Sequence, residues 1–116
     1  ISVYYPSLLK TLKEGFKTNY EERLEEIIKC DILLLDDIGA ENNTAWARDE
    51  ILGTILQYRM DNGLSTFFTS NLNLEELETH LETTSNSVDK IKARRIIERI
   101  KQLTNPMELI SENLRK

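Results

Sequence analysis

The run Ile32-Leu33-Leu34-Leu35-Asp36-Asp37 decides the fold that this sequence predicts, because four aliphatic residues in a row end in two adjacent carboxylates. A short apolar run without polar alternation is typical of a strand buried on both faces in a parallel α/β sheet. Ligands of such sheets bind outside the carboxyl ends of the strands. The two acids therefore predict a site for metal and phosphate chemistry at that edge of the sheet.

Other elements are predicted on both sides of this strand. The β-branched and aromatic residues 1–5 predict a strand that Pro6 ends, and Ser7 is predicted to cap the next helix. Further helices and strands are expected at residues 19–29, 45–61, 64–70, 73–82, 88–103 and 107–110, with a mobile polar loop at 83–87. This order predicts one α/β domain over residues 1–116, a three-layer fold with a mostly parallel sheet.

Composition limits the classes of protein that the chain can belong to. A length of 116 residues suits one domain with a modest core. No apolar run approaches the roughly 18 residues that a membrane span needs, so no membrane partner is expected. Cys30 is the only cysteine, which excludes an internal disulfide and suits the reducing cytoplasm. The net charge of −5 argues against nucleic-acid binding over the whole surface, but it leaves room for a local basic face.

Two polar groups at strand ends are candidates for chemistry. The pair Asp36-Asp37 could bind Mg²⁺, which takes one or two carboxylates, and an acid beside the metal ligand can orient or deprotonate a water molecule. Asn71 ends the next predicted strand, so it is expected beside the acid pair, where its amide can donate to a phosphate oxygen. The alternative for both groups is a solvated strand end or turn, where Asp and Asn are common.

Basic residues supply two further candidates. Lys90, Lys92, Arg94, Arg95, Arg99 and Lys101 lie on the helix predicted at 88–103. Arg95 and Arg99 fall together beside its apolar stripe, and an arginine in that place can bind a phosphate through two hydrogen bonds. A solvated charged face is the alternative. On the first helix, lysines at positions 10, 13 and 17 share one face.

Together these features resemble a known family. The run Leu33-Leu34-Leu35-Asp36-Asp37-Ile38-Gly39-Ala40-Glu41 resembles the Walker B segment of bacterial helicase loaders of the DnaI/DnaC type, which are AAA+ ATPases of the replication-initiator branch. Phe68-Thr69-Ser70-Asn71 is similar to their sensor 1, and Arg95-Ile96-Ile97-Glu98-Arg99-Ile100 to their arginine-finger segment. The resemblance covers nearly the whole chain. It implies a cytoplasmic primosome component that uses ATP to load the replicative DNA helicase when replication starts or restarts.

The resemblance also implies a role for each candidate residue. Asp36 would bind Mg²⁺, Asp37 would be the catalytic base, and Asn71 would sense the γ-phosphate of ATP. Arg99 is the expected arginine finger, with Arg95 as second choice. A finger acts on ATP held by a neighbouring subunit, so self-association through the ATP interface is expected. Residues 7–29 would form the initiator-type helical insertion, in which Lys10, Lys13 and Lys17 would contact single-stranded DNA.

The sequence departs from the family pattern in one respect: it contains no G-x-x-x-x-G-K-[ST] motif, the P-loop that cradles the phosphates. The P-loop and the helicase-binding N-terminal domain are therefore expected upstream of Ile1, and this chain alone is predicted to be inactive. A transposition-helper ATPase similar to IstB remains an alternative. So does a non-catalytic adaptor, because Asp37 replaces the commoner Walker B glutamate. A phospho-acceptor receiver domain is disfavoured, because no strand-end lysine follows Asn71.

Overall fold

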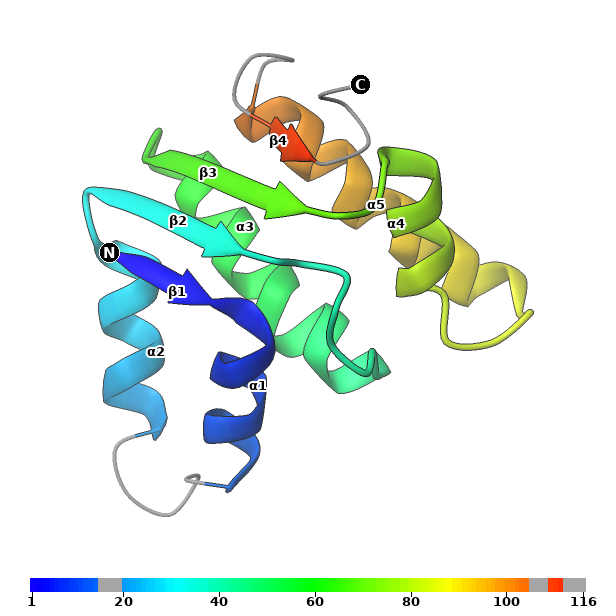
Figure 1. Cartoon of the computed structure of the whole chain (residues 1–116), viewed down its shortest axis with the longest axis horizontal. Helices are drawn as coiled ribbons and strands as arrows, with labels where there is room; N and C mark the ends of the chain where they lie inside the picture. The colour runs from blue at the N-terminus through cyan, green and yellow to red at the C-terminus, as the bar shows by residue number, and fades with distance from the viewer. Residues whose placement is uncertain (15–19, 105–108, 112–116) are drawn as a thin grey trace.

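A parallel sheet of four strands, in the spatial order β1-β2-β3-β4, forms the centre of the computed structural model, which describes residues 1–14, 20–104 and 109–111 (Figure 1). The strands are β1 (Ser2–Tyr4), β2 (Ile32–Asp36), β3 (Ser65–Ser70) and β4 (Leu109–Ser111). Each neighbouring pair is parallel. The predicted α/β class and parallel sheet are thus confirmed. The last strand was expected at 107–110, of which 107 and 108 lie outside the described residues.

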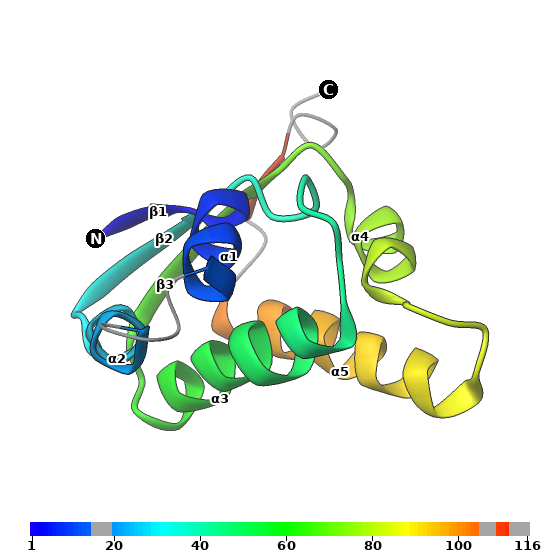
Figure 2. The same ribbon diagram turned by 90° about the horizontal axis from the view of Figure 1, so that it is seen from below.

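Helices connect each strand to the next. The helices are α1 (Tyr5–Glu14), α2 (Tyr20–Lys29), the π-helical segment η1 (Ala47–Leu52), α3 (Gly53–Asp61), α4 (Leu74–Leu81) and α5 (Ser87–Leu103). Parallel strands in sequential order need a crossover at every step, and nearly all such crossovers are right-handed. The described helices must therefore lie on the same face of the sheet, as Figures 1 and 2 show.

Burial of the strands follows from this one-sided arrangement. Leu33 and Leu35 of β2 are fully buried beneath the helices, together with Phe68 of β3. On the opposite face Ile32 is 58% exposed and Leu34 is half-buried. The prediction that β2 is buried on both faces is therefore wrong for the described part of the chain, where helices form a layer on one face only.

Helix boundaries confirm some predictions and correct others. The helix expected from residue 73 begins there, because Asn73 and Glu76 form a capping box at the start of α4. The backbone N–H of Ala47 donates to Thr44 Oγ1 at 3.1 Å. Ser7, however, is not a cap, because α1 already begins at Tyr5. Pro6 lies in the first turn of α1, where its missing N–H removes no helical hydrogen bond. The loop expected at 83–87 ends one residue earlier, because α5 begins at Ser87, and Thr83 and Thr84 in this loop donate to Asp89 of α5.

Arg59 is completely buried, and it joins the C-terminal end of α2 to the starts of β2 and β3. Its guanidinium donates to the Thr66 hydroxyl at 2.7 Å and to the carbonyl oxygens of Ile28, Cys30 and Ser65 at 2.9, 2.6 and 2.7 Å. The carbonyls at the end of a helix carry partial negative charge, so α2 stabilises this cation although no carboxylate contacts it.

The chain should therefore lose much of its stability when Arg59 is replaced by Met. The substitution leaves several buried carbonyl groups without donors, so we expect the free energy of unfolding to fall by about 3 kcal/mol or more. Urea denaturation would measure the loss. As a control, Arg23→Met on the exposed side of α2 breaks only the surface pair with Glu26 and should change stability by at most about 0.5 kcal/mol. Equal losses in the two variants would contradict the assigned role of Arg59.

A second buried cation, Arg48, connects η1 to the start of α5. Its guanidinium donates to Asp89 Oδ1 at 2.6 Å, to the Leu81 carbonyl oxygen at 3.0 Å and to both carboxylate oxygens of Asp49. The hydroxyl and N–H of Thr83 and the N–H of Thr84 also donate to Asp89. These donors, first the Thr83 hydroxyl and then Arg48, hold the pKa of Asp89 well below its ordinary value.

Stability should depend on pH through Asp89. Because its pKa is depressed in the folded state, its contribution is complete above the ordinary pKa of 3.8 and is lost as the pH falls toward the folded-state pKa. At pH 7 we expect Asp89→Asn to lower the free energy of unfolding by about 3 kcal/mol. The difference from the unmodified chain should shrink as the pH falls below 4. Asp61→Asn, at an exposed position, is the control, and a difference independent of pH would refute this account.

Candidate functional site

The acid pair lies at the carboxyl end of β2, and β3 holds it in place. Asp36 is the last residue of the strand, and Asp37 follows with φ 62°, a left-handed conformation that Asp adopts more readily than most residues. The N–H of Asp37 donates to Thr69 Oγ1 at 2.7 Å, and the same hydroxyl donates to Asp36 Oδ1. The N–H of Ile38 donates to the Thr69 carbonyl oxygen at 2.9 Å. One residue of β3 thus fixes three consecutive residues of the turn.

A second hydroxyl approaches the acid pair from β1. Tyr4 lies opposite Asp36 in the strand register, and its hydroxyl donates to Asp37 Oδ2 at 3.1 Å. This hydrogen bond, and then the charge of Asp37, raise the pKa of Tyr4 above its ordinary value, so the hydroxyl stays protonated and remains a donor. The sequence interpretation missed both Tyr4 and Thr69. Their places at the ends of the strands flanking β2 were the signal that could have indicated them.

Asn71, the amide expected beside the acid pair, lies just beyond the end of β3 with an exposed side chain. The side chain of β3 that contacts Asp36 belongs instead to Thr69, two residues earlier. Side chains two residues apart point to the same side of a regular strand, so Asn71 would point the same way as Thr69 only if β3 continued past Ser70. The chain turns after Ser70, whose hydroxyl donates to the Ile38 carbonyl oxygen at 2.6 Å.

The acid pair suits a hard cation that shares its ligands with a substrate. Within the described residues, no three His, Cys, Asp or Glu side chains gather as a metal site, which does not fit a structural zinc. Mg²⁺ instead takes one or two carboxylates and keeps water or phosphate oxygens as its other ligands. Asp36 Oδ2 and Asp37 Oδ1 accept no hydrogen bond from any described residue, so one oxygen of each carboxylate is available.

The turn after the acid pair is held in place by contacts with Leu72 and α4. Gly39 adopts φ +98°, and a Cβ atom there would lie 2.8 Å from Leu72 Cδ1, so the position favours glycine. The N–H of Gly39 donates to Glu41 Oε1 at 2.8 Å, and Glu41 Oε2 lies 3.1 Å from His80 Nε2 on α4. The buried carboxylate of Glu41 therefore ties this turn to α4.

Arg95 and Arg99 do not border the acid pair. They line a hollow of about 550 Å³ between α3 and α5, together with Lys92, Gln57 and Asp49. Arg95 is exposed and Arg99 is half-buried, while the apolar residues at positions 93, 96, 97 and 100 are buried as predicted. The structure thus places both arginines on the surface of the helical layer, where a second molecule could reach them.

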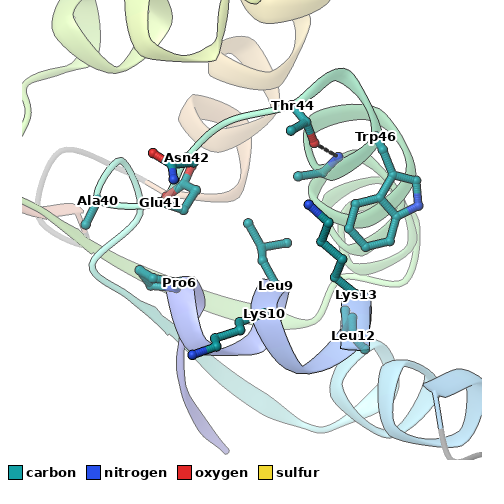
Figure 3. A pocket seen from close by; sticks show the side chains of 11 residues that line it. Pro6, Leu9, Lys10, Leu12, Lys13, Ala40, Glu41, Asn42, Thr44 and Trp46 are labelled. Carbon is teal, nitrogen blue, oxygen red and sulfur yellow. Dashed lines mark hydrogen bonds between the residues drawn. The ribbon is translucent and has the colours of Figure 1, made fainter. Parts of the chain in front are cut away.

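A larger hollow, of about 810 Å³, lies between α1 and the start of the helix that contains η1 (Figure 3). Lys10 and Lys13 lie on the α1 side, and both are exposed. Leu9 points into the hollow, and in this view the side chain of Lys13 lies between Leu9 and Trp46, which is 37% exposed. The third lysine of the predicted set, Lys17, lies outside the described residues. This hollow therefore combines an aromatic ring, an apolar wall and two cations.

Comparison with known proteins relates the chain to one kind of replication protein. No known protein-family profile matches it. It is 42% identical over 115 residues to the replicative helicase loader DnaI of Bacillus subtilis, a match that includes 97% of this chain but only 37% of that protein. A crystal structure of DnaI superposes with a TM-score of 0.83 at 42% identity, over 95% of this chain and 55% of the other.

The match extends over only part of the relative. The chain spans little more than a third of the length of the curated relative, so it corresponds to part of that protein. None of the helices that the structure describes is long and apolar enough to cross a membrane. Over almost its whole length, this chain is related to part of the replicative helicase loader DnaI and shares its fold.

Proposed function

We propose that this chain is the C-terminal ATPase region of a cytoplasmic protein that loads the replicative DNA helicase. The observation that carries the proposal is the match to a helicase loader over 97% of the chain, with an acid pair at the end of the central strand. In the proposed protein the P-loop and the helicase-binding domain precede residue 1. The P-loop would supply the phosphate cradle that the four isolated glycines of this chain cannot supply.

Each residue of the acid pair has a separate role in the proposed site. Asp36 would hold Mg²⁺, which when bound neutralises charge on the ATP phosphates. Asp37 would orient and deprotonate the attacking water, with its Oδ1 facing that molecule. Asn71 would contact the γ-phosphate from the end of β3. The one free oxygen on each carboxylate supports this division of roles.

Hydrolysis between subunits follows from the position of the arginines. Arg99, with Arg95 as second choice, would stabilise the charge on ATP bound to a neighbouring protomer. Support comes from their place in the hollow between α3 and α5, which the acid pair does not line. Self-association would then bring this hollow of one protomer against the acid pair of the next.

A chimera can test the ATPase proposal: this chain replaces the matching 115-residue region of B. subtilis DnaI. Asp37→Asn should preserve ATP binding but slow hydrolysis about 100-fold or more, because the general base is lost. Arg99→Ala should slow assembly-dependent hydrolysis about 1,000-fold. Phosphate release would measure ATP hydrolysis, and the fluorescence of a labelled nucleotide would measure ATP binding. This chain alone, without an upstream segment that carries the P-loop, should hydrolyse no ATP.

Matched controls lie on the same elements. Asp31→Asn changes an exposed acid before the other end of β2, and Arg94→Ala changes an exposed arginine of α5. Both should hydrolyse ATP normally. Normal hydrolysis in Asp37→Asn and Arg99→Ala would contradict the assignment. Helicase loading without any ATP hydrolysis in the unmodified chimera would favour the non-catalytic adaptor. DNA-target selection without helicase binding would favour the transposition helper.

We also propose that single-stranded DNA binds the hollow between α1 and Trp46. Base–aromatic stacking and lysine–phosphate contacts together are the usual means of binding single strands without sequence preference. Trp46 offers the stacking surface, while Lys10 and Lys13 offer the charges. Glu41 also lines the hollow, and its carboxylate accepts the N–H of Gly39 and lies beside His80.

Single-stranded DNA should quench the fluorescence of Trp46, the only tryptophan of the chain. Lys10→Gln and Lys13→Gln should each weaken binding for every sequence and reduce the slope of log K against log salt by about 0.7, because one phosphate contact is lost. Trp46→Ala should cost about 1–3 kcal/mol, measured by anisotropy of labelled oligothymidylate. Lys90→Gln on α5 is the control. Unchanged affinity in all three variants of the hollow would exclude this site.

A further inference from the structure

We propose that Thr69 and Tyr4 are positioning residues, whose hydroxyls hold the carboxylates of Asp36 and Asp37 in the orientation that ATP hydrolysis requires. This inference rests on the proposed ATPase function and gives a role to two residues that had none. Thr69 lies in the segment similar to sensor 1, where only Asn71 was assigned a role, and Tyr4 lies outside the motifs. Its basis is that the strands on both sides of β2 each direct one hydroxyl at the acid pair.

Thr69 makes the stronger of the two connections. A hydroxyl has one proton to donate and lone pairs that accept, and here both functions are used. The proton is donated to Asp36 Oδ1, and the oxygen accepts the N–H of Asp37 at 2.7 Å. A single side chain therefore fixes the direction of the Asp36 carboxylate and the left-handed backbone of Asp37. A serine at this position would keep both bonds, whereas a valine of the same shape would lose both.

Tyr4 completes the arrangement from β1. Its hydroxyl donates to Asp37 Oδ2, so the remaining oxygen of that carboxylate, Oδ1, is turned away from β1. In the same way, the hydroxyl of Thr69 donates to Asp36 Oδ1, while Asp36 Oδ2 accepts no hydrogen bond from a described residue. Each carboxylate thus has one oxygen held by protein and one free for substrate. Tyr4 is 49% exposed, so its hydroxyl should matter little for the stability of the fold.

The position of Tyr4 also links the acid pair to α1. Tyr4 is the last residue of β1, and α1 begins at the next residue and carries Lys10 and Lys13. A change in α1 would reach Asp37 through one peptide bond and one hydrogen bond. The two hydroxyls differ in this respect, because Thr69 is half-buried on β3, whereas Tyr4 ends β1, the strand that leads into α1 and the larger hollow.

The catalytic part of the inference can be tested in the chimera. Thr69→Val should lower kcat about 10- to 100-fold, the usual effect of losing a partner that orients a ligand, with the affinity for ATP changed less than about twofold. Thr69→Ser should restore kcat. Tyr4→Phe should lower kcat about tenfold without shifting the unfolding temperature. Thr79→Val on the exposed side of α4 is the control. Normal kcat in Thr69→Val, or an equal loss of ATP affinity, would overturn the inference.

The geometric part can be tested in this chain without any ATPase. In Thr69→Val the backbone amide of Asp37 should exchange its hydrogen several-fold faster, because its acceptor is gone, whereas Thr69→Ser should match the unmodified chain. Unchanged exchange at Asp37 would overturn the inference whatever the kinetics show. If exchange behaves as expected but the unmodified chimera hydrolyses no ATP, the proposed function fails, and the catalytic role of the two hydroxyls fails with it.

Discussion

The handedness of the connections between parallel strands determines the rest of this structure. Because the strands follow one another in order, right-handed crossovers place the described helices on one face, and no described helix covers the other face of β1, β2 and β3. The carboxyl ends of the strands then meet at one edge. Tyr4, the acid pair and Thr69 become neighbours although they are more than 30 residues apart in the chain. The candidate site follows directly from the connectivity.

Two buried arginines then hold the helical layer in place: Arg59 joins it to the sheet, and Arg48 joins its helices to one another. Arg59 is surrounded by carbonyl oxygens and a hydroxyl, whereas Arg48 is neutralised by Asp49 and Asp89. A buried cation that loses its partners is costly, so each cluster allows only a narrow range of positions for the elements around it. Arg48 and Asp89 set the start of α5, and the direction of that helix sets where Arg95 and Arg99 reach the surface.

Much of the fold and part of the site could be predicted from the sequence. Periodicity located the apolar stripe of α5, and the acids after Leu35 marked the end of β2 at which the candidate site lies. Contacts between distant residues could not be predicted, because Tyr4 and Thr69 gain their importance only from the strand register. The cap assigned to Ser7 failed because a proline fits the first turn of a helix as well as it ends a strand. The π-helical turn at η1 also had no local signal, since its backbone bond from Gly53 to Arg48 depends on packing.

The two arginine clusters differ in a way that affects how the molecule comes apart in acid. The ligands of Arg59 are backbone carbonyls and a hydroxyl, which do not titrate, so protons cannot loosen the junction of α2, β2 and β3. The ligands of Arg48 include the carboxylate of Asp89, which acid protonates. Acid should thus detach the end of the molecule that contains α4 and the start of α5 while the sheet remains folded. Such a partly open form would keep the acid pair in place but release α5, the helix that carries Arg95 and Arg99.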